Sequence, residues 1–334
     1  MTAPDVTVAV PVRDGGRRLR LVLDAVRGQR TARGVELLVC DSGSTDGSIA
    51  IARSRGARVL TIPPRDFCHG RTRNLLAREA AGRHIVFLTQ DAVPATQHWL
   101  DRLLDAFSAA PDVGLVYGPY LPQEDASPMT ARGLESFFAT MAPGGGLRVD
   151  RLCPEARAVP SRELLGPRAF FTDANGCVAR GAWEQVPFRN VPYAEDHQLA
   201  IDMLRAGYAK VFVPDAAVEH SHEYPPVRRV QRCFDEWRAL REIYGWVEPL
   251  GVTAPRDRIL SPARADVRWA GERGAAPRAQ AALALRAVVY HAARTAGAVL
   301  GSRHRRLPPA VRGVLSLECR ATFLPVEHQD VGTS

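Results

Sequence analysis

Hydrophobic and polar positions alternate in blocks over the first hundred residues, and the blocks have the lengths of strands and helices. Near-continuous apolar runs are typical of strands buried on both faces of a parallel sheet. These runs occupy residues 6–12, 35–40, 58–62 and 84–88. Between them, apolar residues recur at helical spacing, as at Leu19, Val22, Leu23 and Val26. The alternation predicts a doubly wound sheet with right-handed crossovers.

Regular structure is expected beyond residue 100 as well, with one interruption. The pattern predicts a helix at 97–109 and a strand at 114–117, then a helix at about 196–206 and a strand at 211–213. Residues 122–168 are rich in proline, glycine and arginine. Such a composition predicts a mobile excursion from the fold.

The chain after Tyr224 is mostly helical in pattern and rich in arginine. The pattern predicts a linker or loosely ordered loop at residues 252–278 and a helix at residues 279–300. The basic cluster RHRR follows at 303–306. The apolar stripe of that helix comprises Ala281, Leu285, Val288, Val289, Ala292, Ala296 and Val299. A helix of this kind can lie in the headgroup plane of a membrane. The alternative is that its stripe packs on the rest of the chain or on a second subunit.

The composition indicates an anionic partner but does not identify it. The 334 residues include 44 Lys and Arg against 36 Asp and Glu, a net charge of +8. A basic balance favours an anionic partner, which includes nucleotides, phosphorylated lipids, acidic membranes and nucleic acids. Nearly all the positive charge is arginine, which suits phosphate binding and is equally explained by coding bias.

Cysteine usage and the N-terminus bear on the compartment. The six cysteines form no C-x-x-C pair, which predicts buried thiols in a reducing environment. The N-terminal residues lack the pattern of a signal peptide, and no uncharged apolar run reaches the roughly 18–20 residues that span a bilayer. These features predict a cytoplasmic protein.

The first motif that carries chemistry is the loop DSGSTDGS, which follows the strand at 35–40. Ligands of doubly wound folds bind beyond the carboxyl ends of strands. Asp41 at that position can accept a hydrogen bond from a base N–H or a ribose hydroxyl. Ser44, Thr45 and Asp46 also suit the N-cap of a helix, so a capped helix start is the alternative interpretation.

Two further motifs precede and follow the strand at 84–88. The sequence FCHGRTRN places Arg71 and Arg73 before a helix, an arrangement that predicts a diphosphate site; a solvated arginine pair is the alternative. The sequence FLTQDAVP places Asp91 at the tip of the strand, where a carboxylate can hold a hard cation. An exposed acidic residue without a ligand is the alternative there.

The remaining motifs lie near the end of the α/β pattern. Glu195 and Asp196 stand where a loop becomes a helix, and they either complement the helix dipole or supply a general base. In VEHSH, His220 and His222 point to opposite faces if the chain is extended, so we expect one of them to serve a metal site. A surface histidine pair is the alternative.

These motifs occur in one order and together resemble the family 2 glycosyltransferases of GT-A fold over about residues 5–225. VPVRD resembles the opening strand of that family, and CDSGSTDG resembles its D-D-G-S-T-D-G loop, with Ser42 in place of the second aspartate. GRTRN…FLTQDA is similar to its A-R-N…L-D-x-D-D stretch. The Glu195–Asp196 pair is similar to its E-D motif, in which the second acid is the base.

The departure from the family lies at the metal motif. Asp91 is the one acid there, flanked by Thr89, Gln90 and Ala92. However, TQDA combined with FCHGRTRN and HSH is similar to the rhamnosyltransferase branch, in which the donor would be dTDP-rhamnose and a histidine would supply a further metal ligand. The C-terminal run GSRHRRLPPAVRGVLS resembles the tails of that branch.

The resemblance implies inverting sugar transfer by a single displacement, with Asp196 as the base that deprotonates the acceptor hydroxyl. It assigns the donor site to Pro11, Val12, Arg13, Asp41, Ser44, Arg71, Arg73 and Gln90. It assigns a divalent metal, Mg²⁺ or Mn²⁺, to Asp91, His220 and His222. It assigns the sugar or acceptor pocket to Asp173, Asn175, Trp183 and Glu195.

The expected architecture is a GT-A type α/β fold, with a doubly wound mixed sheet covered by helices on both faces and a C-terminal helical appendage. Residues 1–225 would form the catalytic domain, with a nucleotide-sugar half at about 1–120 and an acceptor half at about 121–225. Residues 226–334 would form a basic helical region in contact with the inner face of the plasma membrane. Expected partners are a dTDP- or UDP-sugar and a glycan or polyprenyl-linked acceptor, and no nucleic acid. A nucleotidyltransferase and a non-catalytic nucleotide-sugar or glycan-binding protein remain the alternatives.

Overall fold

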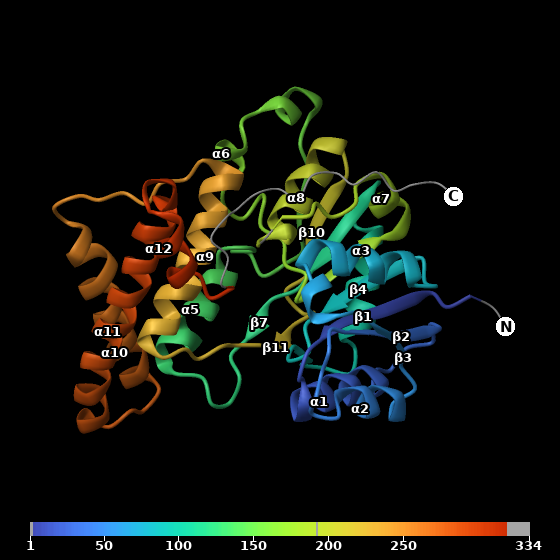
Figure 1. The fold of residues 1–334 in the computed structure, drawn as a ribbon, viewed down its shortest axis with the longest axis horizontal. Helices are drawn as coiled ribbons and strands as arrows, with labels where there is room; N and C mark the ends of the chain where they lie inside the picture. The colour runs from blue at the N-terminus through green and yellow to red at the C-terminus, as the bar shows by residue number, and fades with distance from the viewer. Residues whose placement is uncertain (1–2, 192, 319–334) are drawn as a thin grey trace.

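A mixed eight-stranded sheet forms the centre of the molecule (Figure 1). The computed structural model describes residues 3–191 and 193–318. The strand order in this sheet is β3-β2-β1-β4-β9-β6-β10-β8. The strands are β1 (Val6–Val12), β2 (Val35–Asp41), β3 (Arg58–Thr61), β4 (His84–Leu88), β6 (Val113–Tyr117), β8 (Arg148–Asp150), β9 (Asn175–Ala179) and β10 (Ala209–Phe212).

The first four strands of the chain are parallel, and the later ones make the sheet mixed. Strand β1 pairs in parallel with β2 and with β4, and β2 pairs in parallel with β3. Strand β9 runs antiparallel to β4 on one side and to β6 on the other, while β8 is an antiparallel edge next to β10. The predicted doubly wound, mixed sheet is confirmed.

Helices cover both faces of the sheet because alternate strand residues are apolar on each side. On one face, the even-numbered valines of β1 pack with the apolar stripe of α1 and with α2 and α4. On the other face, Ala9 and Phe87 pack with α3, α7 and α8. The helices are α1 (Gly16–Arg27), α2 (Ser48–Ser54), α3 (His69–Glu79), α4 (Trp99–Asp105), α7 (Arg180–Gln185) and α8 (Glu195–Ala206).

A second, three-stranded sheet lies between the large sheet and the C-terminal helices (Figure 1). Its order is β5-β11-β7, formed by β5 (Val93–Pro94), β7 (Tyr120–Leu121) and β11 (Val218–Glu219). Glu219 is paired with Val93 in the antiparallel register of β11 and β5. This register brings the HSH segment beside the end of β4.

Two segments expected to lack regular structure have it. The predicted excursion at 122–168 contains α5 (Pro128–Ala139) and the edge strand β8. The predicted linker at 252–278 contains a short π-helix at Arg256–Leu260 and helix α10 (Ser261–Glu272). Long-range ion pairs explain the difference, because buried Asp266 of α10 binds both Arg132 of α5 and His291.

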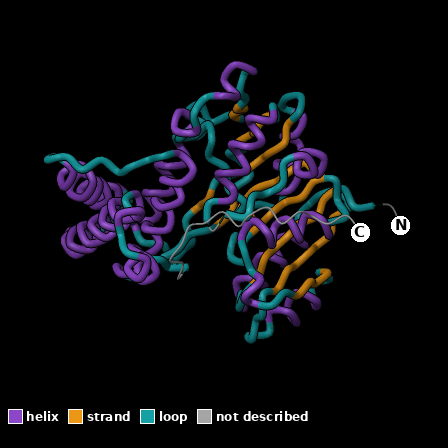
Figure 2. The backbone as a smooth tube through the Cα atoms, turned by 45° about the horizontal axis from the view of Figure 1, so that its top comes forward, coloured by secondary structure: helices purple, strands orange, loops and turns teal. Residues whose placement is uncertain are grey.

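The C-terminal region is a helical bundle beside the sheet domain, as the separate group of purple helices in Figure 2 shows. It comprises α9 (Pro226–Tyr244), α10, α11 (Pro277–Ser302) and α12 (Pro309–Leu315). Helix α11 packs closely on α9: a Cβ atom at Gly297 or Gly301 would lie 2.5 or 2.3 Å from a backbone oxygen of α9. Glycine is therefore required at both positions for this helix contact.

The predicted stripe of α11 faces solvent over much of its length. The buried side of the helix is formed instead by residues that include Leu283, Ala287 and His291. Leu285 is 71% exposed and Val289 is 40% exposed. Of the predicted RHRR cluster, His304 is buried against Glu242, which also pairs with Arg305. None of the helices in the described part of the chain is long and apolar enough to cross a membrane.

Candidate active site

The carboxyl ends of β1, β2 and β4 form the first part of the site. Asp41 ends β2 and is 2% exposed. Its Oδ2 atom accepts hydrogen bonds from the backbone N–H groups of Gly43 and Ser44, at 2.9 and 3.0 Å. Its Oδ1 atom is buried and has no hydrogen-bond partner among the described residues. A buried acceptor without a partner is costly, so Oδ1 is available for a donor group of a ligand.

The loops around Asp41 are held by side chains that we expected to contact the donor. The Gln90 amide donates to the backbone oxygen of Arg13 and accepts from its N–H, at 3.0 and 2.8 Å. The Ser44 hydroxyl accepts from the N–H of Asp14 at 2.8 Å. Gln90 and Ser44 thus fix the end of β1, where Pro11 is half-buried, Val12 is buried in the core and Arg13 is exposed.

Asp91, His220 and His222 form a cluster whose ligand atoms all lie within 4.8 Å of one another. Oδ1 of Asp91 lies 3.4 Å from Nδ1 of His220, and Oδ2 lies 3.7 Å from Nε2 of His222. The expectation that one histidine faces the site is wrong. Strand β11 ends at Glu219, so the alternation of an extended chain does not continue through the HSH segment.

The chemistry of this cluster fits a divalent metal. Burial lowers the pKa of His220 to about 4 and also lowers the pKa of His222, so both imidazoles are neutral at pH 7, the form that binds metals. The Nδ1 atom of His220 is buried without a hydrogen-bond partner among the described residues. One carboxylate and two neutral imidazoles would leave further coordination positions for phosphate oxygens and water.

The second cluster is the acid pair at the start of α8. Ala194, immediately before it, has a positive φ of 60°, which is uncommon for a residue other than glycine. Asp196 accepts a hydrogen bond from the N–H of His197 at 2.8 Å. Burial, with the nearby charge of Glu195, raises the pKa of Asp196 to about 7. A carboxyl group with this pKa suits a general base near neutral pH.

Arg73 is placed differently from our expectation. Its side chain is 3% exposed and donates to Oδ1 of Asp173 at 2.7 Å, with Glu195 at 2.9 Å on the other side. Such an enclosed, doubly paired guanidinium is not exposed to a donor diphosphate. Arg71 does lie at the surface, where it donates to the backbone oxygen of Asp66.

Two residues expected in the sugar or acceptor pocket belong to the interior instead. Asn175 is fully buried, accepts from Trp99 and donates to two backbone oxygens, so its hydrogen bonds serve the fold. Trp183 packs in the core, and its indole N–H donates to Asn74. Asp173 is also buried, and burial raises its pKa beside Glu195.

Tyr120 of β7 connects the metal cluster to the acid pair. Its ring contacts the ring of His220, with centroids 4.9 Å apart, and its hydroxyl bonds to Thr172. The charges of Asp196 and Asp173 act on the same hydroxyl and help burial to raise the pKa of Tyr120. The metal cluster and the candidate base therefore both lie near Tyr120. No motif marked Tyr120 in the sequence.

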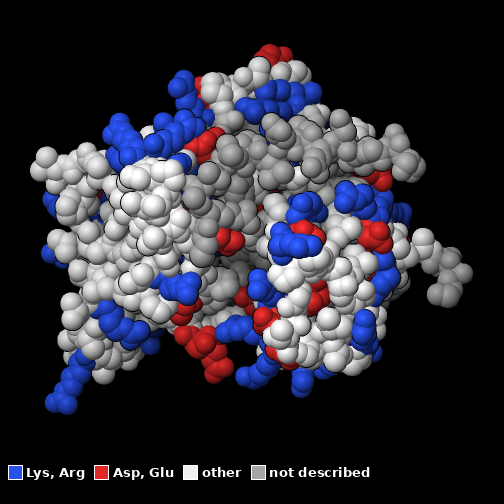
Figure 3. Space-filling view, in the orientation of Figure 1, with Lys and Arg blue, Asp and Glu red and all other residues white. Residues whose placement is uncertain are grey.

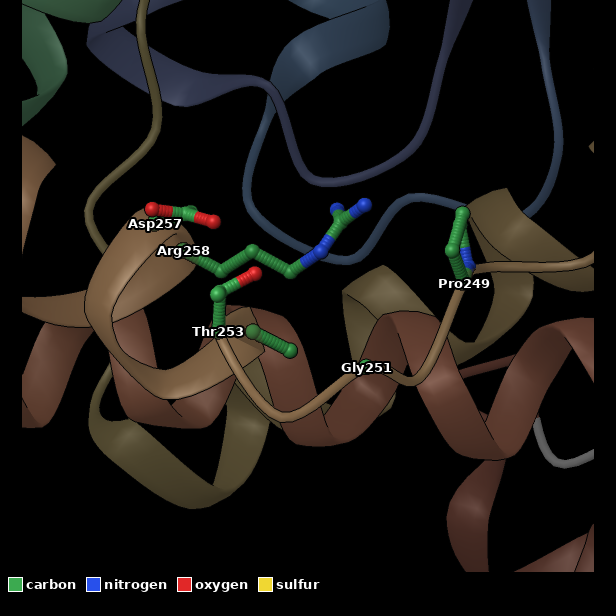
Figure 4. A pocket seen from close by; sticks show the side chains of 6 residues that line it. Pro249, Gly251, Thr253, Asp257 and Arg258 are labelled. Atoms are coloured by element: carbon green, nitrogen blue, oxygen red, sulfur yellow. The ribbon is translucent and has the colours of Figure 1, made fainter.

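The face of the molecule drawn in Figure 3 is hollowed between the C-terminal helices and the β1–β4 half of the sheet. The hollow lies where Figure 1 labels β7 and β11. A different pocket, of about 410 Å³, lies in the connection between α9 and α10 and is lined by residues that include Pro249, Thr253 and Asp257 (Figure 4). It contains none of the metal or acid residues, and we do not assign the chemistry to it.

Comparisons with known proteins agree with this geometry. The model of the family described as Glycosyl transferase family 2 matches residues 7–153. The O-antigen chain rhamnosyltransferase RfbN of Salmonella typhimurium is 30% identical over 236 residues, which cover 69% of this chain and 70% of that protein. The rhamnosyltransferase WbaN of Salmonella anatum is also 30% identical, over 70% of this chain and 71% of that protein.

A solved structure extends the similarity to the fold. The mannosyltransferase PcManGT from Pyrobaculum calidifontis, in complex with GDP-Man and Mn²⁺, matches with a TM-score of 0.58 and covers 90% of this chain and 88% of its own. At 19% identity this likeness shows the fold alone. Together with the relatives in sequence, it establishes that the chain belongs to glycosyltransferase family 2, has the GT-A fold and is a glycosyltransferase.

Proposed function

We propose that this glycosyltransferase moves rhamnose from dTDP-rhamnose to a glycan or a polyprenyl-linked glycan, with inversion at the anomeric carbon. The names of the relatives RfbN and WbaN support rhamnose as the sugar. The observation that carries the mechanism is that the Asp91–His220–His222 cluster and the raised-pKa carboxyl of Asp196 both lie near Tyr120.

Two carboxylates have separate roles in the proposed reaction. Asp41 Oδ1 accepts from the nucleobase or ribose of the donor, and Asp196 accepts the proton of the acceptor hydroxyl. The acceptor oxygen forms a bond to the anomeric carbon as the bond from that carbon to the β-phosphate oxygen breaks, and the electron pair leaves on the nucleoside diphosphate. The transition state is oxocarbenium-like, as in other glycosyl transfers.

A divalent metal held by Asp91, His220 and His222 would supply positive charge for the leaving diphosphate. Two imidazoles and one carboxylate favour Mn²⁺ over Mg²⁺, because Mg²⁺ prefers an all-oxygen shell. The mannosyltransferase of the same fold was solved with Mn²⁺, in line with this preference.

A lipid-linked acceptor would place the enzyme at the inner face of the plasma membrane. We propose that the exposed apolar face of α11, with Leu285 and Val289, rests on that surface. Residues 226–318 contain 17 arginines and eight acidic residues, an excess of nine positive charges, whereas the whole chain has an excess of eight. The positive charge is therefore concentrated in the helical region.

The test is a donor panel assayed for transfer and for slow donor hydrolysis, with dTDP-rhamnose, UDP-glucose and GDP-mannose and with Mn²⁺ or Mg²⁺. We expect turnover with dTDP-rhamnose and inversion visible in the anomeric signals of the product by NMR. Turnover restricted to another donor would overturn the choice of sugar. Binding of nucleotide sugars without transfer or hydrolysis would favour the non-catalytic alternative.

A further inference from the structure

An arginine that no motif marked lies near both clusters of the site. Arg232 lies on α9, in the helical region, and its guanidinium stacks over the ring of Tyr193 at 4.6 Å. Within the described chain it forms no ion pair and no hydrogen bond. Its neighbours on the same helix differ, since Arg229 pairs with Glu223 and Arg238 pairs with Asp235.

Arg232 lies near the metal cluster. Its positive charge acts on both imidazoles of that cluster and lowers the pKa of His222, after the larger effect of burial. It also acts on Tyr224, whose ring centroid lies 5.7 Å from that of His222. The guanidinium is thus close enough to the metal ligands to act on them electrostatically.

Arg232 is also connected to the acid cluster, through aromatic contacts. The ring of Tyr193 lies 6.3 Å from the ring of His69, centroid to centroid, and Nδ1 of His69 lies 3.7 Å from Oε1 of Glu195. Glu195 directly precedes Asp196 in α8. Arg232 therefore lies near both the metal ligands and the acid pair.

A half-buried guanidinium without an anionic partner has lost much of its hydration and gained no ion pair in exchange. Against the effect of burial, Tyr193 and Tyr224, and then the carboxylates of Glu236 and Glu318, raise the pKa of Arg232, but neither carboxylate forms an ion pair with it. Arginine presents a planar set of N–H donors that matches phosphate oxygens two at a time. Such a side chain in a site that handles diphosphates is suited to bind one.

We propose that Arg232 binds a phosphate group in the active site, from either the diphosphate of the nucleotide donor or the phosphate that links an acceptor glycan to its lipid. The proposal rests on the proposed function for the identity of these ligands. The arginine supplies positive charge to the phosphate from the helical region. The helical region would then be part of the active site as well as an appendage.

The direct test measures binding of inorganic pyrophosphate, dTDP and thymidine to the full chain by calorimetry in Mn²⁺. Arg232→Gln should weaken pyrophosphate and dTDP binding about tenfold or more, as expected for loss of a charge-assisted contact of about 1.5–3 kcal/mol, and should leave thymidine unchanged. Arg232→Lys, which keeps the charge but not the planar donors, should show a smaller loss. Arg228→Gln is the matched control, since Arg228 is an exposed arginine of the same helix.

A second experiment, on acceptor kinetics, distinguishes the donor diphosphate from the acceptor phosphate as the group that Arg232 binds. If Arg232→Gln binds pyrophosphate and dTDP normally but raises the KM of a polyprenyl-diphosphate-linked acceptor and not that of the free glycan, the phosphate belongs to the acceptor. Unchanged binding and unchanged KM values in a variant with normal thermal unfolding would overturn the proposal. Because pyrophosphate contains neither sugar nor base, its binding tests Arg232 even if dTDP-rhamnose proves to be the wrong donor.

Discussion

The Nη1 atom of Arg73 lies 2.9 Å from Oε1 of Glu195, next to the carboxyl group proposed as the catalytic base. This buried pair helps to give the adjacent acids Glu195 and Asp196 different pKa values. The charges of His69 and Arg73 lower the pKa of Glu195 against the effect of burial, whereas burial and the charge of Glu195 raise the pKa of Asp196. Adjacent carboxyl groups with opposed shifts indicate different roles.

Replacing Asp196 with Asn should remove most transfer activity while donor binding is kept. A positioned base contributes roughly 10²–10⁴-fold to the rate. Because the pKa of Asp196 is about 7, the kcat/KM of the wild type should fall as the pH decreases below about 7. Steady-state kinetics from pH 5 to 9 measure both effects, and near-normal turnover of the variant would exclude Asp196 as the base.

The same substitution should change stability in a pH-dependent way. The pKa of Asp196 is higher in the folded protein than its ordinary value, so the folded state binds this proton more tightly than the unfolded chain. Its contribution to stability is therefore lost as the pH rises through about 7. Relative to the wild type, Asp196→Asn should gain about 1 kcal/mol, a few degrees in Tm, at pH 8, and the gain should shrink toward pH 4. A gain that grows at acid pH would contradict this sign.

Glu195→Gln should move the acid limb of the pH profile to lower pH. The substitution removes the negative charge that raises the pKa of Asp196, and loss of a like charge lowers a neighbouring pKa by about one unit. The plateau rate should change much less than in Asp196→Asn. A profile with the same midpoint and a plateau reduced as strongly would assign the base to Glu195.

Metal removal should abolish activity if the Asp91 cluster holds the ion. Excess EDTA should inactivate the enzyme, and Mn²⁺ should restore it. Asp91→Ala and His220→Ala should weaken nucleotide-diphosphate binding in Mn²⁺ about tenfold or more, because ligand loss reduces metal affinity strongly. His98→Ala is a control at an exposed histidine. Activity that survives EDTA would leave the arginines alone to neutralise the leaving group.

The sheet was predictable because its strands are buried on both faces. The apolar runs at 6–12, 35–40, 58–62 and 84–88 correspond to β1 to β4 within one residue at each end. The segment 252–278 was not predictable in this way. Helix α10 is held by the ion pairs of Asp266 with Arg132 and His291, which lie far from it in the chain. No local sequence pattern predicts such pairs.

The metal ligands of the site could be predicted from the sequence, whereas the surroundings of its arginines could not. Asp91 and His220 stand in motifs, and the β5–β11 register brings them together. Arg73 stands in a motif too, but sequence spacing does not show that Asp173, a hundred residues later, pairs with its guanidinium. Arg232 stands in no motif, and it was identified because it forms no ion pair within the described chain.

The last prediction concerns the outer face of α11. Its exposed Leu285 and Val289, with Arg286 beside them, should give weak, salt-sensitive binding to anionic vesicles, since each basic residue near the surface contributes about 1 kcal/mol, screened beyond a Debye length. Truncation after Ala276 is unsuitable, because it would remove the side of α11 that packs on α9.

Point variants leave that packing intact. Leu285→Asp and Arg286→Glu should each reduce co-sedimentation with anionic vesicles at low salt, and neither should change the free energy of unfolding by more than about 0.5 kcal/mol, as is usual at surface sites. Leu21→Asp on α1 is the matched control, since Leu21 is an exposed leucine outside the helical region. Equal recovery on anionic and neutral vesicles, or equal loss in all three variants, would show that this face of α11 does not bind lipid.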